Sequence, residues 1–317
     1  LNPRLGEKVG DFAMGTGGFL VSALKFLYKQ CVCSDDIAIY QNSVVGQEWK
    51  PFPYLLATTN IMLQNIENPE LYHMDSLNVD LSQYHDSGKV DVIAMNPPYG
   101  GSTDAIVKTR FKSEYRSSET ADLFLVLIME RLAKNGRAGV VVPDGFLFGN
   151  DTAKINIKAR LLKEFNLHTI IRLPGSIFAP YTGIATNVLF FNNEVAEDSL
   201  EGFSTKETWF YRMDMPEGYV HFNKSNPMKI EHTEDIQSWW NDRQEIVLGD
   251  NNIKSKCFNP QELFENGLNF DQCKFPKEEE TILSPEELIN QYWIERQEID
   301  SKIDETLGKI ENILGLK

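Results

Sequence analysis

The sequence has few cysteines, few histidines and no long apolar run. Runs such as Leu123–Met129 are far too short for a membrane span of about 20 residues. The first residues show no charged-then-apolar leader, so we expect a cytoplasmic protein with no membrane partner. Because the histidines are scattered and the cysteines lack zinc-site spacing, we predict no metal site. We expect reduced, partly buried thiols at Cys31, Cys33, Cys257 and Cys273.

Positive charge is also scarce, with 31 Lys and Arg against 46 Asp and Glu and a formal net charge of −15. A protein that grips DNA unaided usually carries a basic surface, because phosphate contacts supply most of the non-specific affinity. The composition therefore indicates either that the chain does not bind nucleic acid or that a partner supplies most of the DNA affinity. At 317 residues and 42% hydrophobic, the chain can form one large α/β domain or two ordinary ones.

Short β-like runs alternate with helical stretches through residues 1–195. Candidate strands are Lys8–Ala13, Val44–Glu48, Tyr72–Met74, Val90–Met95, Ala138–Pro143, Leu167–Leu173 and Asn187–Phe191. Candidate helices are Phe19–Lys29, Pro51–Asn65, Asp122–Lys134 and Thr152–Phe165. This alternation predicts an open, mostly parallel, seven-stranded sheet with helices on both faces. In such α/β sheets, ligands bind beyond the carboxyl ends of the strands.

The alternation weakens after residue 195. We interpret residues 196–284 as an irregular extension packed on the domain of residues 1–195. A long helix is predicted from Pro285, since proline suits the first helical turn and the acids that follow favour the helix dipole. Its apolar residues fall largely on a seven-residue repeat: Ile289, Tyr292, Ile299, Ile303, Ile310 and Ile313. This narrow seam makes residues 285–317 a candidate for docking a partner, the alternative being packing on their own domain.

A glycine-rich turn follows the first candidate strand. It reads Asp11-Phe12-Ala13-Met14-Gly15-Thr16-Gly17-Gly18-Phe19. Glycines let the backbone turn sharply and approach a ligand closely, while the N-terminus of the following helix offers free N–H groups. Dinucleotide-binding proteins have G-x-G-x-x-G here, whereas this chain has an acid, Asp11, just ahead of G-T-G-G. An acid in that position suits a ligand with a cationic amino-acid end better than a pyrophosphate.

Two further acids stand at the ends of the next candidate strands. Glu48 can accept both hydroxyls of a ribose, and Trp49 beside it can pack against an adenine face. Asp75, followed by Ser76 and Leu77, can accept a hydrogen bond from an exocyclic adenine amine, although an acid there is often only a turn residue.

The run Asn96-Pro97-Pro98-Tyr99 follows the candidate strand Val90–Met95. An amine conjugated to a ring is a poor nucleophile. The Asn96 side-chain oxygen and the Pro97 carbonyl can each accept one of its N–H groups, which moves electron density onto the nitrogen. The two prolines stiffen the loop, and Tyr99 supplies a ring on which a flipped base can stack. A plain proline-rich turn is the alternative for this run alone.

In this order, the motifs resemble those of class I, Rossmann-like methyltransferases that act on amino groups. The resemblance implies S-adenosylmethionine as cofactor. Its methionine part would be surrounded by Asp11, Ala13, Gly15, Thr16, Gly17, Gly18 and Phe19. Glu48 would hold the ribose and Asp75 the adenine amine, with Trp49, Ser76 and Leu77 also in the cofactor site. The target-base site would consist of Asn96, Pro97, Pro98 and Tyr99, with Asn96 also next to the cofactor.

Three further runs, at Asn135–Phe148, Ile171–Phe178 and Tyr181–Phe191, resemble the M subunits of type I restriction–modification systems. That resemblance implies methylation of adenine N6 in DNA, with the adenine flipped out of the duplex. A separate specificity subunit would read the sequence, and a second M subunit and a restriction subunit would join the assembly. A specificity subunit that supplies most of the DNA affinity would account for the acidic charge of this chain. The family's helical N-terminal domain is expected to be absent, since only seven residues precede Lys8.

Other functions remain open at this point. Methyltransferases that act on a protein glutamine amide also use N-P-P-Y, because an amide nitrogen poses the same electronic problem. The basic stretch Gly100–Thr120 favours DNA over a glutamine amide as the substrate, because it fits a mobile loop beside a DNA-bound base. A plain solvated loop is an equally good interpretation of this stretch. A non-catalytic assembly scaffold that binds the cofactor is a further alternative, and it is disfavoured because a scaffold would not need a rigid Pro-Pro run. A nicotinamide dehydrogenase is disfavoured by the glycine spacing.

Overall fold

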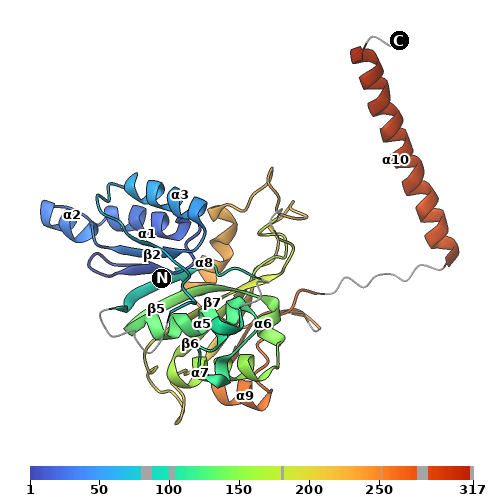
Figure 1. The fold of residues 1–317 in the computed structure, drawn as a ribbon. Coiled ribbons are helices and arrows are strands. Elements are labelled where there is room, and N and C mark those ends of the chain that lie inside the picture. Colours follow the sequence, from blue (N-terminus) through green and yellow to red (C-terminus); the bar gives the residue numbers. More distant parts are fainter. Residues whose placement is uncertain (80–87, 100–103, 180–181, 251, 277–284, 315–317) are drawn as a thin grey trace. The chain divides into compact units, whose positions relative to one another are not determined.

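The computed structural model describes residues 1–79, 88–99, 104–179, 182–250, 252–276 and 285–314. The chain divides into two units, Leu1–Phe275 and Pro276–Lys317. The first unit contains an α/β fold around one large sheet (Figure 1). Its described strands are β1 (Val9–Asp11), β2 (Val44–Glu48), β3 (Glu70–His73), β4 (Val90–Met95), β5 (Leu132–Pro143), β6 (Asn166–Arg172), β7 (Thr186–Asn192), β8 (Thr208–Arg212), β9 (Ile246–Gly249) and β10 (Asn252–Phe258).

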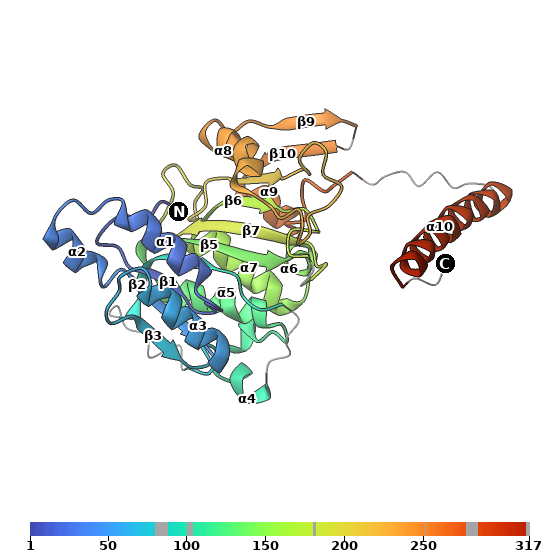
Figure 2. The same ribbon diagram turned by 90° about the horizontal axis from the view of Figure 1, so that it is seen from above.

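Helices connect these strands and cover both faces of the sheet (Figure 2). They are α1 (Gly18–Tyr28), α2 (Ser34–Tyr40), α3 (Pro51–Met62), α4 (Ala105–Lys108), α5 (Thr120–Arg131), α6 (Asp144–Phe148), α7 (Thr152–Glu164), α8 (Glu234–Asn241) and α9 (Pro260–Glu265). Two 3-10 turns, η3 (Ser113–Tyr115) and η4 (Ile230–Thr233), accompany them. The predicted helices are therefore present with slightly different ends, whereas the short helices α2, α4, α6, α8 and α9 were not predicted.

The sheet has the strand order β3-β2-β1-β4-β5-β7-β6-β8-β10-β9, so the described residues form ten strands. The prediction of seven was wrong because β8, β9 and β10, from residues 208–258, extend the sheet beyond β6. The sheet is mixed, with both parallel and antiparallel pairs, and β6 pairs in parallel with β8. Strands β3, β2, β1, β4 and β5 pair in parallel, whereas β7 is antiparallel to both β5 and β6, and β10 is antiparallel to both β8 and β9.

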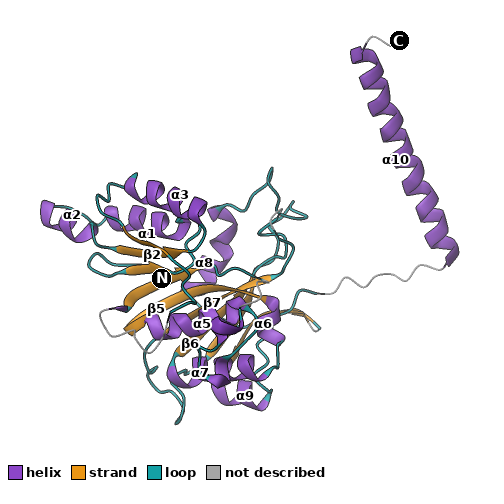
Figure 3. Ribbon diagram, viewed as in Figure 1, coloured by secondary structure: helices purple, strands orange, loops and turns teal. Residues whose placement is uncertain are grey.

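The hydrophobic core has a layer on each face of the sheet. Neighbouring residues of a strand point to opposite faces, and β4 shows this directly. Val92 packs with Leu24 of α1 and Ile61 of α3, while Ile93 packs with Leu127 of α5 on the other face. Figure 3 shows the strands in orange between the two groups of purple helices. Helix α5 is buried along nearly its whole length, which fits its almost uninterrupted apolar sequence.

The second unit contains helix α10 (Pro285–Leu314), at the place predicted for the long C-terminal helix. Within the described residues, no helix is long and apolar enough to cross a membrane.

Candidate active site

The parallel arrangement of β1 to β4 brings the predicted site residues to one edge of the sheet. Val9 of β1 pairs with Val44 of β2 and with Val92 of β4, and β2 pairs in parallel with β3. The carboxyl ends of these four strands therefore meet at the same edge, where ligands bind in open α/β sheets. Asp11, Glu48 and the residues just after β3 and β4 all lie at these ends.

The glycine-rich turn between β1 and α1 has the backbone that its sequence predicts. Gly15 and Gly17 have φ angles of 55° and 82°, a region that favours glycine. A side chain at Gly17 would also contact Ala57 of α3, so this turn lies close to α3. Helix α1 begins directly afterwards with no side-chain cap and no acid in its first turn, which leaves its N-terminus available to a ligand.

Glu48 holds this turn in place. One of its carboxylate oxygens accepts a hydrogen bond from the Gly15 N–H at 2.9 Å, and the other accepts one from the Lys50 N–H at 2.8 Å. Ser76 ties the loop after β3 to the same turn, because its hydroxyl donates to the Phe12 carbonyl at 2.6 Å. Three loops at this edge are therefore joined by direct hydrogen bonds.

Asp11 is 1% exposed at the end of β1. Burial raises the pKa of its carboxyl to about 7; the hydrogen bond from the Ala13 N–H opposes this rise, and the charge of Glu48 adds to it. Within the described part of the chain, no basic side chain is among the causes of this shift. A buried carboxylate without a cationic neighbour is costly, so this site favours a ligand that brings a positive charge.

A cleft of about 680 Å³ lies beside these loops. Its lining residues are Trp49, Lys50, Pro51, His73, Met74, Asp75 and Asn78. The structure thus places Trp49 and Asp75, both predicted site residues, in the lining of one cavity. Ser76 and Leu77 are buried instead, Ser76 in its bond to the turn after β1 and Leu77 in the core. The volume falls within the usual range for small-molecule sites.

The Asn96–Tyr99 run begins directly after β4. The Tyr99 hydroxyl donates a hydrogen bond to the Asn96 side-chain oxygen, so the two residues face each other. Burial raises the pKa of Tyr99, which keeps its phenol protonated. The ring of Phe178 lies 6.4 Å from that of Tyr99 between centroids, at an interplanar angle of 60°. Sequence reasoning assigned no role to Phe178, although it belongs to a loop that follows β6 at the same sheet edge.

Comparison with known proteins agrees with this geometry. The chain matches the family described as N-6 DNA Methylase over residues 1–281. The chain belongs to the N-6 DNA methylase family. It is 40% identical over 319 residues to the type I restriction enzyme EcoEI methylase subunit of Escherichia coli, and the match covers 99% of this chain and 62% of that protein.

Solved structures related to this N-6 DNA methylase chain have the same fold. One belongs to a type I R-M system whose complex assembly has been described, with a TM-score of 0.75 and 32% identity over 98% of this chain and 63% of that one. The type I restriction enzyme EcoKI M protein gives 0.70 and 26%, covering 84% and 62%. The fold is therefore that of class I S-adenosylmethionine-dependent methyltransferases, as predicted. The chain spans less than two thirds of the length of these relatives.

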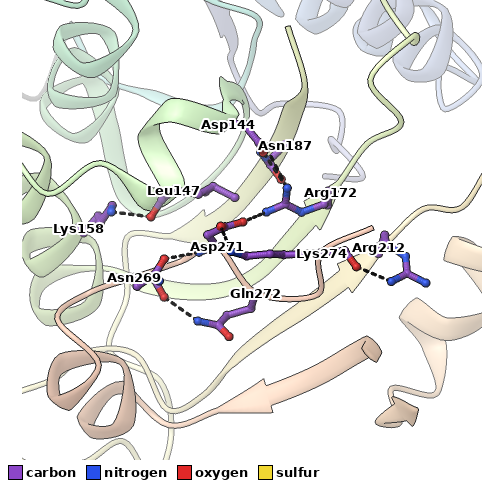
Figure 4. Close-up of polar contacts among 10 residues, drawn as sticks. All are labelled: Asp144, Leu147, Lys158, Arg172, Asn187, Arg212, Asn269, Asp271, Gln272 and Lys274. Atoms are coloured by element: carbon purple, nitrogen blue, oxygen red, sulfur yellow. Dashed lines mark hydrogen bonds and ion pairs between the residues drawn. The ribbon is translucent and has the colours of Figure 1, made fainter. Parts of the chain in front are cut away.

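Beyond β4, a buried polar network continues along the carboxyl edge of this N-6 DNA methylase fold (Figure 4). Arg172, at the end of β6, donates to both carboxylate oxygens of Asp144 at 3.0 Å and also pairs with Asp271. The Asn187 side chain donates to Asp144 at 2.7 Å. These residues come from the three runs that resemble type I M subunits and from the chain segment near residue 271. The network therefore joins the loops around Phe178 to the end of the first unit.

Cations fix the same end segment at two further points. The buried Lys158 ammonium donates to the Leu147 and Leu268 carbonyls at 2.7 and 3.0 Å, and the Arg212 guanidinium donates to the Lys274 carbonyl at 2.6 Å. Residues 268–274 are thus held by positively charged groups of α7, β6 and β8, and hydrogen bonds to charged groups are the stronger class.

Replacing Arg172 with methionine is expected to lower the free energy of unfolding by about 1–3 kcal/mol, because Asp144 loses its cationic partner and Asp271 is left with Lys274, which is mostly exposed. Urea denaturation followed by circular dichroism measures this change. Lys206→Met is the matched control, since the Lys206–Asp198 pair is exposed and such pairs contribute little. Equal effects of the two substitutions would contradict the structural role of the network.

Proposed function

We propose that this chain transfers a methyl group from S-adenosylmethionine to the exocyclic N6 of adenine in DNA, as the catalytic core of a type I modification subunit. The observation that carries the proposal is the Asn96–Tyr99 run at the end of β4, next to the glycine-rich turn at the end of β1. Membership of the N-6 DNA methylase family supports the same chemistry.

The residues at the sheet edge fit S-adenosylmethionine, which supplies the methyl group when bound. Asp11 would pair with its cationic amino-acid end, beside the turn formed by Ala13, Gly15, Thr16, Gly17, Gly18 and Phe19. Glu48 would accept the ribose hydroxyls with the carboxylate that now accepts backbone N–H groups. The cleft that contains Trp49 and Asp75 would take the adenine, where Asp75 can accept the N–H of an amine.

The Asn96–Tyr99 run has the hydrogen-bond acceptors that would orient an adenine amine for methyl transfer. The Asn96 side-chain oxygen and the Pro97 carbonyl would each accept one amine N–H, which orients the nitrogen lone pair towards the methyl donor. The Tyr99 hydroxyl, which now bonds to Asn96, leaves the second lone pair of that oxygen for the substrate. Tyr99 and Phe178 would together offer aromatic faces to a base flipped out of the duplex.

The partners are part of the proposal. A net charge of −15 favours a chain that relies on a specificity subunit for DNA affinity, with a second M subunit and a restriction subunit completing the assembly. We propose α10, whose apolar residues repeat every seven positions, as the helix that docks the specificity subunit. A DNA substrate would place the protein in the cytoplasm. Relatives at 40% and 32% identity are named methylase subunits of type I restriction enzymes, which favours DNA over a glutamine amide or a non-catalytic scaffold.

Two measurements test this function. In equilibrium binding, S-adenosylmethionine is expected to bind the chain and to bind Asp11→Ala and Glu48→Ala at least about tenfold more weakly, because each loses a charge-assisted contact. The chain is then reconstituted with a type I specificity subunit, DNA and radiolabelled cofactor. Label recovered as N6-methyladenine supports the proposal. Label on protein glutamine, or cofactor binding that neither substitution weakens, would overturn it.

A further inference from the structure

The hydroxyl of Thr120, the first residue of α5, donates a hydrogen bond to the Pro98 carbonyl at 2.8 Å. The rings of Pro97 and Pro98 fix the φ angle of both residues, so their remaining backbone freedom lies in ψ. A hydrogen bond to the Pro98 carbonyl restrains ψ of Pro98 and thereby the position of Tyr99, the next residue. Thr120, the first residue of α5, thus adds to the rigidity that Pro97 and Pro98 give to the loop.

The turn that carries Thr120 is itself held by hydrogen bonds. The Ser117 hydroxyl accepts from the Glu119 N–H at 3.0 Å and donates to the Asp122 carboxylate at 2.6 Å. Asp122 is completely buried, in the first turn of α5. Its charge requires a partner, because an isolated carboxylate is strongly destabilising in a protein interior.

That partner is Lys154, in the first turn of α7. Its ammonium lies 2.7 Å from Glu119, 3.1 Å from Asp122 and 3.1 Å from Asp151, and the residue is 4% exposed. Burial lowers the pKa of Lys154, but the bond to Glu119 and the charge of Asp122 outweigh it and hold that pKa above its ordinary value. A side chain at Gly149 would collide with the stem of Lys154, so the glycine leaves room for it. Lys154 therefore joins the starts of α5 and α7.

We propose that Thr120 is a positioning residue for methyl transfer and that Lys154 anchors the turn that carries it. Thr120 donates its hydrogen bond to Pro98 rather than to a proposed amine acceptor, so it would act on those acceptors through the backbone of the Asn96–Tyr99 run. This inference rests on the proposed function and adds to it an element beyond the cofactor and base contacts. Because the hydrogen bond holds the loop in place before the base arrives, its loss should slow the chemical step without weakening cofactor binding.

The test compares Thr120→Val, which removes the hydroxyl at nearly constant shape, with Thr120→Ser, which keeps it. Each variant is assembled with a specificity subunit, and kcat and KM are measured on DNA that contains the target adenine. Base flipping is followed separately by fluorescence on DNA in which that adenine is replaced by 2-aminopurine, which has no N6 amine and is not methylated. We expect Thr120→Val to lower kcat about tenfold, the effect of losing one hydrogen bond of about 1.4 kcal/mol in the transition state. KM for DNA, the Kd for S-adenosylmethionine and the 2-aminopurine signal should be unchanged, and Thr120→Ser should restore kcat.

Thr59→Val is the matched control, because the Thr59 hydroxyl also donates to a backbone carbonyl, that of Leu55, within α3 and away from the Asn96–Tyr99 run. Lys154→Met, checked for an intact melting transition, is expected to lower kcat in the same direction as Thr120→Val. A kcat for Thr120→Val equal to that of the unsubstituted chain, or equal losses for the valine and serine variants, would overturn the inference. An inactive unsubstituted chain would instead overturn the proposed function.

Discussion

Asn96→Ala is expected to reduce methyl transfer to adenine by about 10²–10³-fold while leaving S-adenosylmethionine bound. The Asn96 side-chain oxygen is the acceptor that would hold one amine N–H, and removing one such preorganised polar group from an active site has an effect of that size. The cofactor would keep its contacts with Asp11 and Glu48, which do not depend on Asn96. Single-turnover transfer from radiolabelled cofactor measures the loss directly, because product release does not enter.

The control for that experiment is Asn42→Ala. Asn42 is also an asparagine in a loop, but its side chain donates to the Ala38 carbonyl of α2. Its substitution should leave the single-turnover rate unchanged. If Asn96→Ala retained the rate of the unsubstituted chain, the Asn96–Tyr99 run would be a proline-rich turn without a role in the chemistry.

The part of the site around β1 to β4 was predictable because it depends on short stretches of sequence. A strand, a sharp glycine turn and the start of a helix are all specified between residues 8 and 19, and the positive φ angles of Gly15 and Gly17 confirm that turn. Parallel pairing then places Asp11, Glu48 and Asn96 at one edge without further information.

Strands β8 to β10 could not be predicted in the same way, because the partners that stabilise them are far away in sequence. Arg212 ends β8 and is 1% exposed, whereas an arginine in an aromatic stretch normally indicates a surface position. Its guanidinium is satisfied by Asp214 and by the Asn252 side chain and Lys274 carbonyl. Asn252 and Lys274 are 40 and 62 residues away along the chain, so the local sequence does not show why an arginine is buried in this strand.

Phe178 illustrates the same limit within the site. The sequence places it in a loop after β6, and no local pattern indicates that its ring approaches Tyr99, 79 residues earlier in the chain. The approach follows from the sheet order, in which the carboxyl ends of β4 and β6 share one edge. The hydrogen bond from Thr120 to Pro98 likewise joins the start of α5 to the end of β4 and is invisible in the sequence.

Binding of S-adenosylmethionine is expected to strengthen as the pH rises from 5 to about 7 and then to level off. The pKa of Asp11 in the folded chain is raised from 3.8 to about 7, so the carboxyl is mostly protonated at pH 5. A cationic ligand group pairs with the carboxylate and not with the neutral acid. Below pH 7 the affinity should therefore fall by up to about tenfold per pH unit, since each binding event must first release one proton.

A rise in pH strengthens cofactor binding through Asp11 but lowers the stability of the unliganded protein. Because the folded state holds the Asp11 proton more tightly than the unfolded chain, this group makes the unliganded protein less stable as the pH rises from about 4 to 7. Cofactor should offset that loss by supplying the positive charge, so the increase in melting temperature on adding S-adenosylmethionine should be larger at pH 7.5 than at pH 5.5. Asp11→Asn removes the titrating group and should bind weakly with a flat pH profile. A variant that kept the rise between pH 5 and 7 would show that another group controls binding, and Asp11 would then be a buried structural acid.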